Sequence, residues 1–126
     1  MEIYGIGTDI IEVDRIKSAI EGNSGFLKRV YTEKEINYCS GKRKEKFNSF
    51  AARFAAKEAV AKALSEGFSK NISLNDIEIS NMDNGAPFIK LYGKTDEFTR
   101  KLKIKEIKIS VSATENFAVA YAVAII

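Results

Sequence analysis

The sequence feature that most constrains the fold is a long alanine-rich segment from Lys44 to Glu66. It contains seven alanines and neither glycine nor proline, and Gly67, a suitable helix terminator, follows it. This composition predicts a long helix in the middle of the chain. Most sides of that helix are apolar, which indicates that it is buried rather than lying at the surface with one solvated face.

The rest of the chain alternates between strand-like and helix-like patterns. Strands are predicted where apolar residues alternate with small or polar ones, over Glu2–Ile10, Asp76–Ile79, Pro87–Tyr92, Lys105–Ala113 and Phe117–Ile125. Shorter helices are predicted over Val13–Ile20, from a capping Thr32 to near Gly41, and over Lys94–Lys103. The order favours an α+β fold with a mainly antiparallel sheet, and the length favours a single domain spanning residues 1–126.

Composition excludes several kinds of chemistry. The chain contains no histidine, which excludes imidazole catalysis, a Ser-His-Asp triad and histidine-ligated metals, so any metal has to be a hard cation held by oxygen ligands. Cys39 is the single cysteine, which fits a reducing compartment. The N-terminus has no basic leader, and the longest apolar run, Phe117–Ile126, is too short to span a bilayer. We therefore expect a soluble cytoplasmic protein without membrane contact.

Glu58 is the most unusual residue of the predicted long helix. On a helical wheel it falls on the same face as Phe47, Ala51 and Phe54, which is the expected core-facing stripe. A buried glutamate needs a cation or strong hydrogen bonds, because an unpaired charge in a low dielectric is costly. The alternative is an ordinary surface pair between Glu58 and Lys62, one helical turn apart.

Asp9 raises a matching question at the end of the first predicted strand. Gly5 and Gly7 precede it and indicate either a backbone that another group approaches closely or a bulge. Asp9 either forms a turn or helix cap, or joins Glu58 in holding one Mg²⁺ whose other positions are filled by a phosphate ligand and waters. A further hypothesis is that these two carboxylates come from different subunits.

Basic residues accompany these carboxylates. Arg53, Lys57 and Lys62 lie on the long helix and either neutralise ligand phosphates or form a solvated basic face. The net charge of +3 favours phosphate-bearing ligands or acidic partners. The basic run Gly41–Lys46 is short and lacks interleaved aromatic residues, so it predicts nucleic-acid binding only weakly, and we expect none.

Two of these segments carry a family resemblance. Gly5–Ile10, followed by Asp14-Arg15-Ile16, resembles the opening motif of the bacterial holo-acyl-carrier-protein synthases. Arg53–Ala63, which reads RFAAKEAVAKA, is similar to the most specific motif of that family. Further segments occur in the expected order, over Phe26–Glu35, Asp76–Ile79 and Asn84–Pro87, so that the resemblance covers nearly the whole chain.

The resemblance implies a fold and an activity. The fold is that of the 4′-phosphopantetheinyl transferases, with an antiparallel sheet packed against the long helix. Such enzymes move the phosphopantetheine arm of coenzyme A onto a serine of apo-acyl carrier protein and release adenosine 3′,5′-bisphosphate. They use Mg²⁺, and they are usually homotrimers whose active sites are shared between neighbouring subunits.

The resemblance also implies roles for individual residues. Asp9 and Glu58 would be the metal ligands, and Glu58 would take the serine proton directly or through a water. Lys62 would contact the coenzyme A phosphates and act in catalysis. Binding of the adenosine end would fall to Arg53 and to the turn from Gly85 to Pro87, and Arg15 would contact the acidic carrier protein.

Three positions depart from the family pattern. Ala113 stands where many members have a histidine, and Ala86 stands where the usual turn sequence has a lysine, which we expect to weaken binding of the 3′-phosphate. Glu66 adds an acidic side chain to the segment after the long helix. None of these departures involves Asp9, Glu58 or Lys62, so activity is still expected.

Two other functions remain open at this stage. A non-catalytic module would bind coenzyme A or an acidic protein without turnover, and Glu58→Gln would leave that binding largely intact. A nucleic-acid-binding protein would require steeply salt-dependent binding of DNA or RNA.

Overall fold

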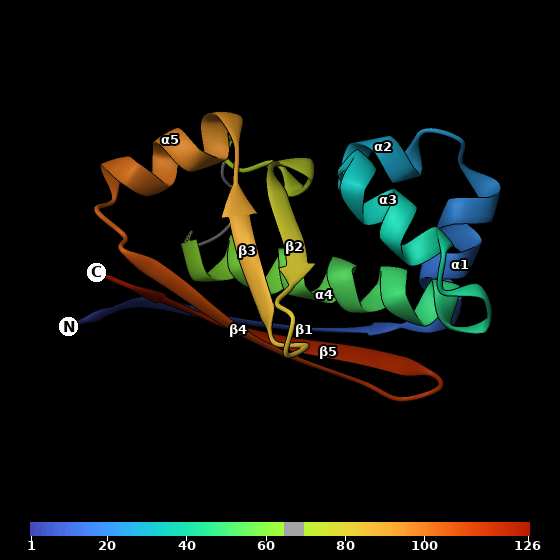
Figure 1. Ribbon diagram of the computed structural model, residues 1–126. Helices are drawn as coiled ribbons and strands as arrows, with labels where there is room; N and C mark the ends of the chain where they lie inside the picture. Colours follow the sequence, from blue (N-terminus) through green and yellow to red (C-terminus); the bar gives the residue numbers. More distant parts are fainter. Residues whose placement is uncertain (65–69) are drawn as a thin grey trace.

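The computed structural model describes residues 1–64 and 70–126, and its centre is a three-stranded antiparallel sheet crossed by one long helix (Figure 1). The strands lie in the order β1-β5-β4, with bounds β1 Ile3–Glu12, β5 Phe117–Ile125 and β4 Glu106–Ala113. Helix α4, Lys46–Leu64, packs on one face of this sheet against β1 and β5. The predicted long helix and the last strand are thereby confirmed.

The remaining elements cover the other sides of α4. A two-stranded antiparallel hairpin, β2 Ile77–Asn81 and β3 Pro87–Leu91, contacts α4 through β2 and β4 through β3. Figure 1 shows α1, α2 and α3 gathered near the start of α4, and α5 beside the hairpin. Their bounds are α1 Val13–Gly22, α2 Phe26–Val30, α3 Glu33–Ser40 and α5 Gly93–Lys101, with short 3₁₀ turns η1 Arg43–Glu45 and η2 Leu74–Asp76.

Small residues allow α4 to lie close to the sheet. Every second residue of β5 from Ala118 to Ala124 is a buried alanine facing the helix. In β1, a Cβ atom on Gly5 or Gly7 would collide with the carbonyl oxygen of Ala63 or Ala59. The close-approach interpretation of the two glycines is therefore confirmed, and the pairing of β1 with β5 also shifts register between Ile3 and Gly5.

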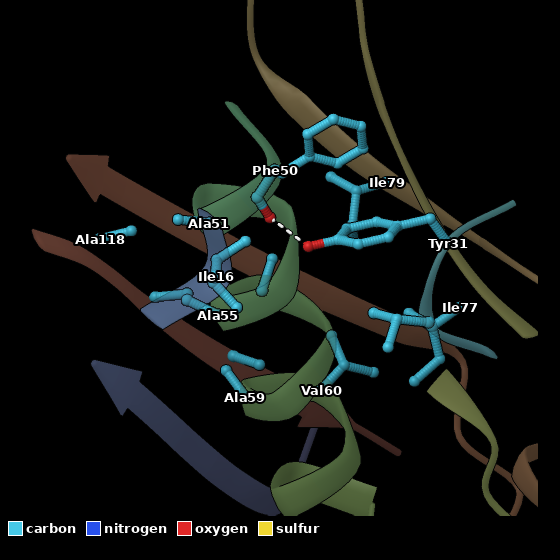
Figure 2. Packing of buried hydrophobic residues seen from close by; sticks show 14 of the residues in the cluster. Ile16, Tyr31, Phe50, Ala51, Ala55, Ala59, Val60, Ile77, Ile79 and Ala118 are labelled. Atoms are coloured by element: carbon cyan, nitrogen blue, oxygen red, sulfur yellow. Dashed lines mark hydrogen bonds between the residues drawn. The ribbon is translucent and has the colours of Figure 1, made fainter. Parts of the chain in front are cut away.

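The core on the opposite side of α4 holds the larger side chains. Tyr31 packs edge-to-face against Phe50, and its hydroxyl donates a hydrogen bond to the Phe50 carbonyl at 2.7 Å (Figure 2). Ile77 and Val60 are fully buried in the same cluster. This contact fixes the segment before α3 against the first turns of α4.

Several predicted bounds shift by one or two residues, as in β1, which ends at Glu12 rather than Ile10. Three differences from the sequence-based prediction have a physical reason. The hairpin forms a second sheet, because β3 contacts β4 without joining its hydrogen-bonded ladder. The five-residue helix α2 was not predicted. Helix α4 begins at Lys46 rather than Lys44, because Arg43 has a φ of 53° and the chain forms a 3₁₀ turn there.

The structure describes the long helix only as far as Leu64. The predicted helix end at Glu66 and Gly67 lies outside the described residues. Among the described residues, no helix is both long and apolar enough to cross a membrane.

Candidate active site

Asp9 and Glu58 approach each other at the edge where β1 passes beneath α4. Asp9 follows Gly5 and Gly7 at alternate positions of β1, so its side chain lies on the face of the sheet that α4 covers. Burial raises the pKa of the Glu58 carboxyl, and the neighbouring Asp9 raises it further, whereas Lys62 lowers it. Burial also raises the pKa of Asp9, again against the effect of Lys62. The two carboxylates therefore repel each other in a partly desolvated position.

Lys62 lies beside these carboxylates but pairs with only one of them. Its ammonium donates to the Thr8 carbonyl at 2.9 Å and to Asp9 Oδ1 at 3.4 Å. The predicted surface pair between Glu58 and Lys62 is absent from the ion pairs of the described residues. The Lys62 side chain remains 54% exposed, and one of the three donors of its ammonium is left for a ligand.

The arrangement suits a hard divalent cation. Asp9 Oδ2 is buried and has no hydrogen-bond partner in the structure, and Glu58 is a half-buried carboxylate within electrostatic reach of it. Within residues 1–64 and 70–126, no group of three or more histidine, cysteine, aspartate or glutamate side chains gathers in one place. Two carboxylates suit Mg²⁺, which keeps several coordination positions for waters and ligand phosphates.

The helical-wheel argument about Glu58 was only partly right. The fully buried residues of α4 form two faces, one of alanines toward the sheet and one around Phe50 and Val60 toward the hairpin. Glu58 lies at the border between these faces, together with the partly exposed Phe47 and Phe54. A helix that is apolar on nearly all sides gives no dominant stripe, so its orientation was not predictable from spacing.

Lys57 does not belong to the phosphate-binding residues, which corrects the sequence-based interpretation. Its side chain is fully buried, and its ammonium lies 2.6 Å from Glu35 Oε1. It also donates to the backbone carbonyls of Leu74, at 3.0 Å, and Ile77. Lys57 is a structural cation of the core, and desolvation lowers its pKa.

Glu35, the ion-pair partner of Lys57, was not predicted from the sequence. The capping pattern from Thr32 to Glu35 was recognised, and both bonds of that capping box are present. Glu35 Oε2 also accepts a hydrogen bond from the Ile79 amide at 2.8 Å, in addition to the ion pair with Lys57. Nothing in the local pattern indicated this second role, because its partners are far away in the sequence.

Arg53 and the hairpin turn form a second group of predicted residues. They line a pocket of about 170 Å³, whose wall consists of Ala52, Arg53, Ile79, Asn81, Gly85, Pro87 and Val111. Arg53 is buried, its guanidinium lies 4.2 Å from the Tyr38 ring, and its Nε has no hydrogen-bond partner in the structure. Gly85 has a φ of +88°, which only glycine adopts without strain. Asn81 is a pocket residue that the sequence did not indicate.

The two groups lie on opposite flanks of α4. Arg53 and Glu58 are five residues apart, which places them about 140° apart around the helix axis. The pocket reaches Val111 on β4, whereas Asp9 lies on β1, and β5 separates these two strands in the sheet. The structure thus brings Asp9 and Glu58 together with Lys62, and Arg53 together with the turn, but keeps the two groups apart within one chain.

The other predicted positions lie farther from these groups. Arg15 is exposed on α1. Ala113 ends β4 opposite Ala118, and the Ala86 amide donates to the side chain of Asn84. Glu66 lies outside the described residues.

Comparison with known sequences identifies similar proteins over nearly the whole chain. A family model described as the 4′-phosphopantetheinyl transferase superfamily matches residues 5–122. The holo-[acyl-carrier-protein] synthase of Ruminiclostridium cellulolyticum is 50% identical over 119 residues, covering 94% of this chain and 89% of that protein. The corresponding protein of Clostridium tetani is 48% identical over 125 residues, with 96% and 94% covered.

Solved structures show the same fold. The holo-[acyl-carrier-protein] synthase of Neisseria meningitidis is 31% identical with a TM-score of 0.87, covering 98% of both chains. The Helicobacter pylori protein of that name, solved in complex with coenzyme A, is 38% identical with a TM-score of 0.77, covering 94% of this chain and 98% of that one.

Proposed function

The chain belongs to the 4′-phosphopantetheinyl transferase superfamily, and from this premise we propose that Asp9, Glu58 and Lys62 form its reaction centre. It is an enzyme that transfers the 4′-phosphopantetheine group of coenzyme A to a serine of apo-acyl carrier protein, giving holo-acyl carrier protein and adenosine 3′,5′-bisphosphate. The fold, the antiparallel sheets and the long helix agree with the resemblance found in the sequence.

One observation supports the proposed centre: the partly desolvated carboxylates of Asp9 and Glu58 lie close together, beside the partly exposed side chain of Lys62. Asp9 and Glu58 would hold Mg²⁺, which supplies positive charge against the pyrophosphate of coenzyme A. Glu58 takes the serine proton, directly or through a water, because its carboxylate lies at the partly exposed edge beside Asp9 and Lys62. The exposed ammonium of Lys62 contacts the ligand phosphates from the same edge.

The adenosine end of coenzyme A is assigned to the pocket of Arg53, Gly85 and Pro87. The guanidinium of Arg53 lines this pocket, and its charged donors suit phosphate oxygens. The turn contributes a narrow wall, because Gly85 has no side chain and Pro87 is rigid. Ala86 offers no charge in this turn, so we expect binding of the 3′-phosphate to be weakened.

We further propose a homotrimer whose active sites are shared between subunits. One coenzyme A needs both groups of residues, and these lie on opposite flanks of α4 in one chain, so the pocket of one subunit would serve the carboxylates of its neighbour. The accessible surface of 7946 Å² supports assembly, because a compact monomer of this mass exposes about 6,700 Å². An apolar sheet face supports it too, with Ile6 at 71% and Tyr121 at 58% exposure.

The division between subunits differs from the one suggested by sequence. Because Asp9 and Glu58 approach each other within one chain, we propose that one subunit supplies both metal ligands. The test mixes Glu58→Gln, which is expected to be inactive, with Arg53→Ala, which is expected to bind coenzyme A weakly. The mixture is assayed under conditions of subunit exchange, at a coenzyme A concentration far below the KM of Arg53→Ala. Activity is expected to return, because some interfaces combine an intact pocket with an intact centre. A mixture of Asp9→Asn and Glu58→Gln is the matched control and should stay inactive.

The carrier protein is assigned to the side of the molecule that carries α1. Arg15 is exposed there and offers a cation to an acidic partner. We place the enzyme in the cytoplasm, where a free buried thiol such as Cys39 persists without a disulfide.

The decisive experiment follows the mass of the carrier protein. The purified enzyme is incubated with coenzyme A, Mg²⁺ and apo-acyl carrier protein, beside a competent control enzyme. We expect the phosphopantetheine mass on the carrier serine, and we expect Glu58→Gln to abolish it. If the control enzyme modifies the carrier and this protein does not, the transfer activity is contradicted. If Glu58→Gln transfers as fast as the wild type, the proposed reaction centre is wrong.

A further inference from the structure

Asn81 connects the two walls of the pocket through both ends of its side chain. Its Oδ1 accepts a hydrogen bond from Arg53 Nη2 at 3.0 Å, and its Nδ2 donates to the Gly85 carbonyl at 3.0 Å. Arg53 belongs to α4 and Gly85 to the turn between β2 and β3, so one side chain ties the helix to the hairpin.

The Asn81 bond fixes the direction of the Arg53 guanidinium. The Tyr38 ring covers the guanidinium at 4.2 Å, and Asn81 holds Nη2. The Nε of Arg53 is buried without a hydrogen-bond partner, so it is an unsatisfied charged donor in a residue that lines the pocket. A planar guanidinium held at one nitrogen presents its other donors in a fixed direction.

The turn itself does not depend on Asn81. The Gly85 amide donates to the Met82 carbonyl at 2.8 Å, and the Met82 amide donates to the Ala86 carbonyl at 2.8 Å. The Ala86 amide is satisfied by the side chain of Asn84 at 2.9 Å. Asn81 is also exposed at the end of β2, so its removal opens no core. Its side chain therefore positions the turn relative to Arg53 rather than shaping the turn.

We propose that Asn81 is a positioning residue that sets the affinity for the nucleotide end of coenzyme A by orienting Arg53 against the hairpin turn. This inference rests on the proposed assignment of that pocket. In the absence of Asn81, the Arg53 guanidinium gains freedom that nucleotide binding has to remove, so ground-state binding weakens while the chemistry at the distant carboxylates is unchanged.

The experiment is a double-mutant cycle of Asn81→Ala and Arg53→Ala. Transfer rates are measured at saturating apo-carrier protein with coenzyme A varied, and adenosine 3′,5′-bisphosphate binding is measured by calorimetry. Asn81→Ala is expected to raise the KM for coenzyme A about five- to twentyfold, with kcat within about twofold of the wild type. Nucleotide affinity should fall by a similar factor.

The cycle separates action through Arg53 from a general effect on the hairpin. In the Arg53→Ala background, Asn81→Ala should change KM and nucleotide affinity by less than about twofold, because the group it positions is gone. The matched control is Asn75→Ala, an exposed asparagine whose side chain donates to the Lys28 carbonyl outside the pocket. It should leave both constants unchanged.

Two results would overturn the inference. One is an unchanged nucleotide affinity in Asn81→Ala, and the other is an equal loss with and without Arg53. Neither result would contradict the proposed reaction, because phosphopantetheine transfer by the wild type is measured in a separate experiment. Conversely, calorimetry still tests Asn81 if the wild type transfers nothing to the carrier.

Discussion

Neighbouring residues on α4 have opposite roles because each step along a helix turns the side chain by about 100°. Lys57 points into the core and is fully buried, whereas Glu58 lies at a half-buried edge beside Asp9. The motif that contains both residues therefore combines a structural cation with a candidate catalytic carboxylate. Residue type alone does not separate these roles, since either charge is compatible with a site.

The buried pair of Lys57 and Glu35 leads to a stability prediction. Lys57→Met should lower the free energy of unfolding by about 3–5 kcal/mol, because it leaves the Glu35 carboxylate buried without its cation. Lys57→Met combined with Glu35→Gln should lose less than the sum of the single changes. Urea unfolding measures all three variants. A loss below about 1 kcal/mol for Lys57→Met would contradict a charged, buried pair.

Glu58→Gln is expected to separate stability from activity. The pKa of Glu58 is raised in the folded protein, so folding favours its protonated form, and ionisation costs stability. The cost is absent below the unfolded pKa near 4.5 and complete above the raised folded pKa. Glu58→Gln should therefore stabilise the metal-free protein at pH 7 by a fraction of a kcal/mol after solvent screening, but not at pH 4.

Thermal unfolding at the two pH values tests this prediction. Addition of Mg²⁺ should raise the melting temperature of the wild type more than that of the variant, since ligand binding to the folded state stabilises it. The same variant should have lost transfer activity. A variant that is less stable than the wild type at pH 7 would show that Glu58 contributes favourable contacts instead of repulsion.

The elements that could be predicted from the sequence are those specified by local pattern. The strict alternation of alanine with larger residues over Phe117–Ile125 gave the last strand with the bounds that the structure shows, and the Thr32 capping pattern marked the start of α3. Helix α2 has only five residues and no measurable periodicity, so it was missed. The separation of two sheets and the ion pair of Glu35 depend on contacts between distant segments, which local pattern does not contain.

The residues of the candidate site were likewise predictable only where a local motif or residue type indicated them. Asp9, Glu58 and Lys62 were singled out because motif and residue type drew attention to them, and the structure places them together. Asn81 was missed because an asparagine at the end of a strand is ordinary, and its partners Arg53 and Gly85 identify it only in three dimensions.

The contact between β1 and α4 gives a prediction at the scale of elements. Gly7→Ala should destabilise the fold by about 1–3 kcal/mol or more, because the new Cβ would collide with the Ala59 carbonyl and force the helix away from the sheet. Gly22→Ala is the matched control. Nothing lies within 4 Å of a Cβ at that helical position, so it should stabilise by about 0.5–1 kcal/mol. Chemical unfolding compares the two variants, and equal effects would contradict this packing.

At the scale of the whole molecule, the outer face of the three-stranded sheet predicts assembly. Ile6 and Ile10 point away from α4 on β1, at 71% and 64% exposure, and Thr8 between them pairs with Tyr121 on β5. An apolar face of this kind on a small chain marks a protein interface. The proposed trimer would bury this face and bring the pocket of one subunit to the carboxylates of the next.

Ile6→Lys tests this arrangement, because a lysine buried in an apolar interface is costly while the same lysine on a free surface is not. We expect the variant to sediment as a monomer, to keep the circular dichroism of the folded chain, and to lose transfer activity by at least about a hundredfold. Ile6→Val keeps the apolar face and should remain trimeric and active. Analytical ultracentrifugation gives the mass, and a folded Ile6→Lys monomer with full activity would show that each chain completes its own site.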